Sequence, residues 1–536
     1  MIKLEINLKR VQTFIFEVPR LKAMLGANAL IGQTMRHELP QLLGKRGAQL
    51  NWAEAQHLTH ADDPLDDCCE GDDADDPRAL YRRGILARDG GHFIVVFDDE
   101  SRAQEFLREA EAKLAESLPG VQFEADIGPF PAPETRGPRA PECQEEHVLD
   151  LPILQVCEET GREPASERET FDGETVWQSA SVGKRKAAGD RFYRGETHDI
   201  IGLMRGALYP DEERGWTPPQ DLGDLASGDY LALIHADGNG IGKRFKDLRN
   251  RDKTDDPEQR EARGEAFFHG MRVVVRRALV DALKQTYKAD SYSGGTRPYE
   301  LLMLGGDDLL MLCRANDALR FAHIYVSELA RYRLQDGHPL HVAIGVAIAK
   351  KSYPLHRLNV LAEALAGSAK RLYRSLDKED QDSVIDWQVV TQSWFNDLQA
   401  ARRASDLVRY RVGETTETLL LTGRPYRVDG EAGLAGLLEA ADALDGAGEA
   451  TGPAEAHEAF APRSPLRALR GACEHGRLAG EMAFARLPER ARTLLAWPDV
   501  HAPTLWQDLG DGRYLTRALD LVGIREIARL GKQQND

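Results

Sequence analysis

The sequence predicts an α+β protein with two ferredoxin-like (βαββαβ) domains, a small irregular linking domain and a C-terminal helical domain. The first observation is the order strand, helix, hairpin, helix, strand, which occurs in residues 1–130 and again in residues 229–390. The second is a glycine-containing turn in each predicted hairpin. The third is a change after residue 391 to a helical pattern rich in alanine and leucine. The chain is therefore predicted to be internally duplicated.

The composition excludes several classes of protein. The 536 residues are enough for about three to four domains with real cores. The net charge of −18 argues against a general nucleic-acid coat, which would be basic. No apolar run reaches membrane-spanning length, and the alternating start of the chain does not resemble a signal peptide. Six cysteines in a chain of this size do not make a disulfide framework. We expect a soluble, cytoplasmic protein without a membrane partner.

The first predicted copy begins with a strand at residues 1–8 and a helical pattern from Val11 to about Leu43. An acidic stretch at 62–76 is typical of a solvated insertion. The remaining elements are two strands at 84–88 and 92–97 around an Asp89-Gly90-Gly91 turn, a helix at 101–117 and a strand at 121–127. This copy has no carboxylate at the end of its first strand, so we expect a scaffold without a metal site.

The region between the copies, residues 131–228, is predicted to be a linking domain. Its proline-rich start at 129–141 indicates an extended linker, and the rest is weakly patterned. The second copy follows with elements at 229–236 (strand), 258–288 (helix), 299–313 (hairpin), 315–334 (helix), 340–349 (strand) and 355–376 (helix). Residues 391–536 form the predicted helical domain.

Three aspartates lie at the ends of apolar runs in the second copy. Asp237 follows one buried strand, and Asp307 and Asp308 occupy the turn of the Gly305-Gly306-Asp307-Asp308 hairpin. Burying a carboxylate is costly unless it is paired or holds a metal ion. Oxygen ligands of this kind suit Mg²⁺ or Mn²⁺, which share the phosphates of a substrate. The pattern therefore predicts a cation site for nucleotidyl transfer.

The glycines around these aspartates fit the same chemistry. Gly238 and Gly240, on either side of Asn239, leave room for a phosphate to meet backbone N–H groups. Gly-Gly-Asp-Asp alone is a common surface turn, and Asp-Gly-Asn-Gly alone is no more specific. Their combination on strands in this order, with a helix between them, is much more specific.

These motifs resemble the large, polymerase-like palm subunit of type III CRISPR–Cas effector complexes, and the resemblance covers most of the chain. Residues 11–15 and 26–30 resemble the opening of that family's first palm domain. Asp237-Gly238-Asn239-Gly240 and Gly305-Gly306-Asp307-Asp308 match its active palm. Further matching segments are Gly345–Ala349, Pro354-Leu355, Ala362-Glu363, Ala369-Lys370 and Arg424-Pro425-Tyr426.

The resemblance implies a set of site residues. Asp237, Asp307 and Asp308 would be the catalytic residues and would hold the metals. The nucleotide would be bound by Gly238, Asn239, Gly240, Gly305, Gly306 and Lys370. Lys370 would neutralise phosphate charge, as a lysine does in the related GGDEF-type cyclases; the alternative is a solvated lysine on a helix. Lys243 and Arg374 are weaker candidates for the same role.

Two departures from the family pattern lead to further expectations. Members often begin with an HD nuclease domain, whereas this sequence starts at the palm-like strand. His198-Asp199 has no ordered set of histidines around it, so we expect no HD-type DNA cleavage. Cys157 resembles the remnant of a zinc ribbon, with Thr160 where the next cysteine would stand. Structural zinc needs four ligands, so we expect no zinc there.

The resemblance implies that the protein converts ATP into cyclic oligoadenylates when its guide-RNA complex binds target RNA. The implied partners are the other effector subunits, including a small helical subunit on the C-terminal domain. Two alternatives stay open: a stand-alone cyclase of the same fold with a different cyclic product, or a catalytically silent scaffold that holds RNA and small subunits.

Overall fold

The computed structural model describes most of the chain, with gaps between eleven segments. These are residues 1–50, 80–131, 154–171, 174–197, 199–201, 215–250, 257–288, 295–390, 397–445, 463–498 and 502–531. The acidic stretch 62–76, most of the proline-rich linker, Cys68, Cys69, Cys143 and His198 lie outside them. Within these segments, no helix is long and apolar enough to cross a membrane.

The first ferredoxin-like domain contains a four-stranded sheet with the order β2-β3-β1-β4. Its central strand β1 pairs antiparallel with β3 on one side and β4 on the other. This is the strand order of a ferredoxin-like fold, as the sequence predicts. The strands are β1 (Ile2–Lys9), β2 (Ile85–Ala87), β3 (His92–Phe97) and β4 (Gln122–Pro129).

The helical pattern predicted from Val11 to Leu43 is divided in the structure. Helix α1 (Val11–Phe16) ends before Pro19, and α2 (Leu21–Gln33) begins after it. Proline removes a backbone donor and disfavours helical geometry in the residue before it. A π-helical turn η1 (Thr34–Glu38) and α3 (Leu39–Leu43) complete this segment, and α5 (Glu100–Ser117) packs on β1, β3 and β4.

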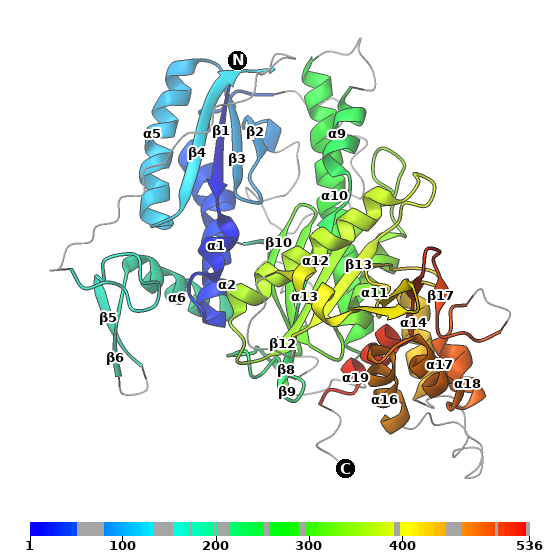
Figure 1. Ribbon diagram of the computed structural model, residues 1–536. Helices are drawn as coiled ribbons and strands as arrows, with labels where there is room; N and C mark the ends of the chain where they lie inside the picture. The colour runs from blue at the N-terminus through cyan, green and yellow to red at the C-terminus, as the bar shows by residue number, and fades with distance from the viewer. Residues whose placement is uncertain are drawn as a thin grey trace.

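The second ferredoxin-like domain lies at the centre of the molecule (Figure 1). Its sheet has the order β10-β11-β8-β12-β13-β16, so the first four positions repeat the strand order of the first domain. The α+β fold class and the duplication of the ferredoxin-like unit are therefore confirmed. The strands are β8 (Tyr230–Gly238), β10 (Tyr299–Gly305), β11 (Asp308–Arg314), β12 (Val342–Lys350), β13 (Val384–Val389) and β16 (Tyr426–Arg427).

Helix α12 (Leu355–Ser375) joins β12 to the parallel strand β13 and packs over both, and over β8. Gly345 on β12 permits this close contact, because a Cβ there would lie 2.1 Å from the backbone oxygen of Ala362. The helix that carries Lys370 is thus held directly over the central strands. The other helices are α9 (Ile241–Arg249), α10 (Pro257–Thr286) and α11 (Ala318–Leu329).

The linking region packs on the first domain through two glycines. Helix α6 (Ala180–Tyr193) runs along α2, and a Cβ at Gly26 would lie 1.8 Å from the backbone oxygen of Arg185. Gly189 on α6 faces the backbone of Lys22 in the same way. Cys157 is buried in a small apolar cluster with Val18, Ala23 and Val182. The strands of this region are β5 (Glu167–Phe171), β6 (Glu174–Gln178) and β7 (Trp216–Thr217), which pairs with β9 (Gly295–Thr296).

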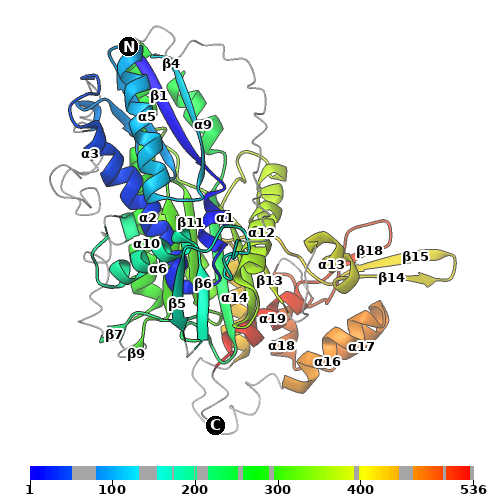
Figure 2. The same cartoon turned by 90° about the vertical axis from the view of Figure 1, so that its left-hand side faces the viewer.

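The C-terminal region is helical, but it also contains a four-stranded sheet with the order β14-β15-β18-β17. The sequence analysis missed these strands although β14 alternates Val408, Tyr410 and Val412 with arginines, because the helical pattern of the surrounding region outweighed this short signal and β15 is mainly polar. Figure 2 shows the β14–β15 hairpin extending away from the two ferredoxin-like domains. The elements are α13 (Leu398–Ser405), β14 (Leu407–Val412), β15 (Thr415–Leu420), α14 (Leu434–Leu444), α16 (Arg463–Glu474), α17 (Arg477–Ala485), α18 (Glu489–Leu495), β17 (Gln507–Asp508), β18 (Arg513–Leu515) and α19 (Ala518–Ala528).

A buried ion pair joins this region to the second domain, and others lie within the region. Arg402 of α13 donates to both carboxylate oxygens of Asp386 on β13, at 2.7 and 2.6 Å. Arg424 lies 3.1 Å from Asp520 of α19 and donates to Asp406 at 3.2 Å. Asp386 is fully buried and Asp520 is 5% exposed, so these carboxylates depend on their partners.

Candidate active site

Backbone pairing brings the three predicted aspartates to one end of the second sheet. In the β8–β11 ladder Ala236 lies opposite Leu309, so the next position along brings Asp237 opposite Asp308. Asp307 precedes Asp308 in the turn between β10 and β11. Residues 70 positions apart in the sequence therefore become neighbours through strand register alone.

The turn of the β10–β11 hairpin is as tight as a hairpin turn can be. Gly305 pairs with Asp308, which leaves Gly306 and Asp307 as the two loop residues. Gly306 has a φ of +59°, which glycine adopts without strain. Across the turn, a Cβ at Gly238 would lie 2.5 Å from Asp307 Oδ2, so only glycine lets the Asp307 carboxylate approach the end of β8.

Burial and mutual repulsion change the proton affinity of these carboxyls. Burial raises the pKa of Asp308 to about 8, with further contributions from the charges of Asp237 and Asp307. The pKa of Asp307 is raised by burial and then by Asp237. The site thus concentrates more negative charge than the protein neutralises, and a cation would relieve it.

Lys370 is one of the cations that the protein itself supplies. Its ammonium group contacts Asp237 Oδ2 from α12. Of the two interpretations of Lys370, the structure therefore places it at the site and not on a solvated helix face. Arg374 and Lys243 are exposed, and Lys243 lines a separate 560 Å³ pocket with Gly240 and Tyr373.

The donor set suits a divalent cation by its chemistry, since carboxylate oxygens are the ligands that Mg²⁺ and Mn²⁺ prefer. Among the described residues, however, no three acidic, histidine or cysteine side chains converge closely enough to hold an ion as they stand. Asp237 is held by Lys370 instead. The carboxylates Asp237, Asp307 and Asp308 would hold the metal after Asp237 turns from the lysine.

Asn239 and Gly240 form the connection from β8 to α9. Gly240 has a φ of +71° and precedes the first residue of α9. The Asn239 backbone N–H donates to the carbonyl of His341 at 2.8 Å, and its side chain is 3% exposed. Because that side chain is buried and the Asn239 N–H is already hydrogen-bonded, any phosphate contact from this segment would come from the backbone N–H groups that follow, at the start of α9.

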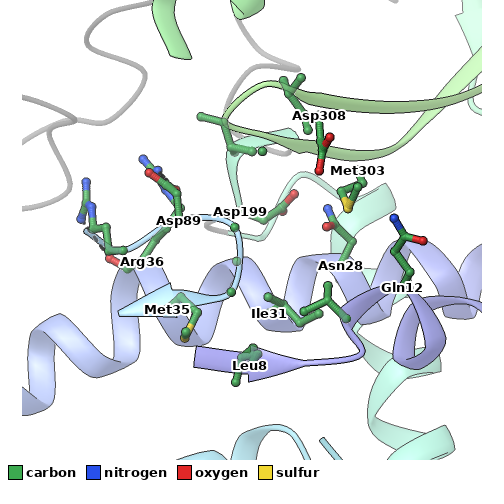
Figure 3. Close-up of a pocket in the computed structure, with 18 of the residues that line it drawn as sticks. Leu8, Gln12, Asn28, Ile31, Met35, Arg36, Asp89, Asp199, Met303 and Asp308 are labelled. Carbon is green, nitrogen blue, oxygen red and sulfur yellow. Dashed lines mark hydrogen bonds and ion pairs between the residues drawn. The ribbon is translucent and has the colours of Figure 1, made fainter. Parts of the chain in front are cut away.

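A cavity of about 450 Å³ lies between the two ferredoxin-like domains, beneath the Gly305-Gly306-Asp307-Asp308 hairpin. Figure 3 shows Asp308 and Met303 directed into it from the second domain, and Asn28 and Ile31 from α2 of the first. A register shift in β10 between Leu301 and Met303 marks a β-bulge, a feature that commonly re-aims a side chain next to a site.

The corresponding end of the sheet in the first domain lacks carboxylates at the positions of Asp237, Asp307 and Asp308. The loop of its hairpin is Gly90-Gly91, because the His92 N–H donates to Asp89 O, and His92 pairs with Asn7, so Asn7 and His92 occupy the positions of Asp237 and Asp308. The Gly90 Cα faces Gly305, 3.7 Å from the position of an added Cβ. Asp89 forms ion pairs with Arg36 and, at 3.9 Å, with Arg272 of α10. The turn of the first domain therefore lies against the β10–β11 hairpin and closes one side of the cavity.

Several side chains at the cavity were not predicted to belong to the site. Asn359 of α12 donates to Gln12 of α1 at 3.3 Å and to Glu363 at 3.1 Å, which links the two domains beside the cavity. Glu363 raises the pKa of Asp308 as a more distant negative charge. Gln12 and Asn28 lie within residues 11–15 and 26–30, the segments that resemble the family's first palm domain. That resemblance is the sequence signal that could have indicated them. Asp199 was considered only as part of the His198-Asp199 dipeptide, and its weakly patterned segment gave no indication of a role at this site.

The fold, with one carboxylate-bearing palm and one without, is the architecture of tandem palm domains. Residues 230–379 match the family model of the Cas10/Cmr2 second palm domain. The resemblance to the large palm subunit that the motifs indicated is therefore confirmed for this part of the chain. No curated protein matches the sequence.

Solved structures of Csm1 resemble the chain at low identity. A Csm1–Csm4 cassette in complex with cA3 is 12% identical with a TM-score of 0.46, and the alignment covers 99% of this chain and 69% of that one. The cassettes with cA4 and with one ATP are 12% and 13% identical, each with a TM-score of 0.36 and coverage of 69% of this chain and 53% of the other. This chain thus spans about half the length of these two structures.

The raised pKa of Asp308 predicts how stability depends on pH without metal. Asp308 keeps its proton in the folded state to about pH 8 but loses it near pH 4 when unfolded. Its protonation therefore stabilises the fold at low pH, and this contribution is lost as the pH rises from about 4 to 8. We expect Asp308→Asn to raise the melting temperature relative to the unmodified protein, increasingly so up to pH 8.

Thermal unfolding of both proteins in chelator, at pH steps from 5 to 9, measures this difference. Mg²⁺ added at pH 8.5 should raise the melting temperature of the unmodified protein more than that of Asp308→Asn. Asp229→Asn, at an exposed carboxyl just before β8, is the matched control and should follow the unmodified protein. A difference between Asp308→Asn and the unmodified protein that does not change with pH would contradict the assignment.

Proposed function

We propose that the protein is a metal-dependent nucleotidyltransferase that makes cyclic oligoadenylate second messengers from ATP in RNA-activated CRISPR antiviral defence. The observation that carries the proposal is the pairing of Asp237 opposite Asp308, with Asp307 in the turn, at the mouth of a nucleotide-sized cavity. The match of residues 230–379 to the Cas10/Cmr2 second palm domain supports the same chemistry.

The two ends of the site would hold two nucleotides. The segment of Gly238, Asn239 and Gly240, through those backbone N–H groups that are not already hydrogen-bonded, and the ammonium group of Lys370 would hold the triphosphate of one ATP. The cavity between the domains would hold the nucleoside of a second. The 3′-oxygen of that acceptor would form a bond to the α-phosphorus of the first nucleotide, while the bond from this phosphorus to the pyrophosphate oxygen breaks. Repetition and closure of the chain would give the ring.

The protein's own groups set the conditions for this reaction. Bound Mg²⁺ or Mn²⁺ would lower the pKa of the attacking hydroxyl and balance the charge of pyrophosphate. Asp237, Asp307 and Asp308 would hold that cation. Lys370, once released from Asp237, would contact phosphate oxygens. The Asp89-Gly90-Gly91 turn of the first domain would keep water from one side of the acceptor.

Inactivation of the turn carboxylates tests the activity. In Asp307→Ala/Asp308→Ala we expect product formation from ATP to fall by at least about a thousandfold, because losing the cation removes several kcal/mol of charge stabilisation. Mass spectrometry of products made with Mg²⁺ or Mn²⁺, alone and within the RNA-bound complex, measures both yield and ring size.

The same measurement distinguishes the alternatives, with Asp229→Ala as a control that keeps full activity. Product from another nucleotide but not from ATP would favour a stand-alone cyclase with a different product. No product from any nucleotide, with normal complex assembly in the double variant, would leave a silent scaffold and refute the proposal.

The role of Lys370 can be separated from that of the metal ligands. We expect Lys370→Met to weaken the apparent affinity for ATP by about 10- to 100-fold, since charge-assisted hydrogen bonds contribute about 1.5–3 kcal/mol. Arg371→Met removes a cation from the exposed neighbouring position on α12 and should leave the affinity unchanged. Equal effects of the two changes would show that Lys370 acts only through net charge.

We also propose that the C-terminal region binds a small helical subunit of an effector complex. Leu478 and Met482, four positions apart on α17, are 69% and 53% exposed, so one turn of this helix presents an apolar face. A helix of a partner could pack on that face.

Charge placed on this face should disrupt the contact. We expect Leu478→Glu/Met482→Glu to weaken binding of the small subunit by about tenfold or more, as for a central interface residue, and to spare ATP turnover by the isolated protein. Co-sedimentation of the purified subunits measures the affinity. Val360→Glu changes an apolar residue that is 58% exposed on α12, and it should have no effect. Unchanged sedimentation of the double variant would place the partner elsewhere.

A further inference from the structure

A buried carboxylate from the linking region lines the cavity between the two ferredoxin-like domains. Asp199 follows α6 in the sequence, is 1% exposed and shares the cavity with Asn28 and Asp308. Figure 3 shows the Asp199 side chain directed into the space below Asp308, beside Asn28. The cavity therefore has a third contributor in addition to the two domains.

The position of Asp199 is fixed by close backbone packing. A Cβ at Gly32 would lie 2.5 Å from the Cβ of Asp199 and 2.9 Å from its Cα, so only glycine lets α2 approach this residue. The hydroxyl of Thr197 donates to Asp199 Oδ1 at 2.6 Å and orients the carboxylate. Ile201 is buried two residues further on. Such a fixed group can distinguish ligands by geometry, because it cannot easily move away.

The side chains around Asp199 match the edge and faces of a purine base. A carboxylate only accepts hydrogen bonds, whereas the amide of Asn28 both donates and accepts. Ile31 and Met303 supply apolar surface for the faces of a ring. An exocyclic amine could donate to Asp199 while Asn28 pairs with the adjacent ring nitrogen. A carbonyl in place of that amine would bring two hydrogen-bond acceptors together, and their lone pairs would repel each other. The cavity of about 450 Å³ is within the usual size range of ligand pockets.

We propose that Asp199, together with Asn28, reads the base of the acceptor nucleotide by accepting a hydrogen bond from the exocyclic amine of a purine. The inference rests on the proposed function, which places a nucleoside in this cavity. Adenine and guanine both carry such an amine, and the experiment separates them. A purely structural role of Asp199 would change the binding of all nucleotides alike.

The test compares pairs of triphosphates that differ in one amine. ATP differs from purine riboside triphosphate by the 6-amine, and GTP differs from ITP by the 2-amine. Competition against a fluorescent ATP analogue gives the four affinities for the full chain. We expect the amine to improve the affinity by about 10- to 100-fold in one pair, the range for a hydrogen bond to a charged group. In Asp199→Ala that ratio should fall to about one, because only the amine loses its partner.

Two further variants make the result specific. Asp199→Asn keeps the shape and one acceptor oxygen without the charge, so it should fold normally and show an intermediate ratio. Asp190→Ala changes a carboxylate of the same linking region, which pairs with Lys22 outside the cavity, and should retain the full ratio. If Asp199→Ala does not fold, Asp199→Asn carries the comparison.

The possible outcomes separate this inference from the proposed function. An amine preference that survives in both Asp199 variants, equal weakening of all four nucleotides, or no amine preference in the unmodified protein would each overturn the inference alone. Failure of the unmodified protein to bind any of the four would overturn the proposed function as well. The pair that responds identifies the base.

Discussion

The antiparallel register of β8 and β11 is the constraint on which the candidate site depends. It brings Asp237 opposite Asp308 and leaves Asp307 in a two-residue turn, where Gly238 and Gly306 make room for it. A shift of one residue would turn every side chain of the strand to the other face of the sheet. The apolar residues on both faces of β8 and β11 are buried, so the core that stabilises the sheet also fixes the carboxylates.

Duplication gives the molecule two similar sheet ends that face each other. The end in the second domain carries the three aspartates, and the end in the first domain forms the opposite side of the cavity. Asn7 and His92 stand where the second domain has Asp237 and Asp308. Asp89, across the two-residue turn from His92, forms ion pairs with Arg36 and Arg272. The loss of carboxylates in one copy thus produced a surface that can lie against the hairpin of the other without electrostatic repulsion.

Strand order, the hairpin turn and the three aspartates could be predicted from the sequence because they depend on local patterns: apolar runs, glycines and the residues at their ends. The contribution of Asp199 could not, since it depends on Gly32 of α2, which lets a weakly patterned segment approach the cavity. The sheet β14-β15-β18-β17 was missed because its strands are short and lie in a region of mainly helical pattern, although β14 itself alternates apolar residues with arginines. The break at Pro19 was visible in the sequence but was outweighed by the helical pattern around it. The domain boundaries at 130, 228 and 390, the metal and the individual roles of the site residues stay predictions.

The bidentate pair between Arg402 and Asp386 has a consequence for how the chain can be divided. A fragment that ended at the predicted boundary of residue 390 would retain Asp386, fully buried on β13, without the guanidinium that compensates it. An uncompensated buried charge of this kind costs about 3–5 kcal/mol. It would also lose β16, the edge strand that covers β13. The smallest unit that could fold independently and be engineered therefore extends well into the helical region.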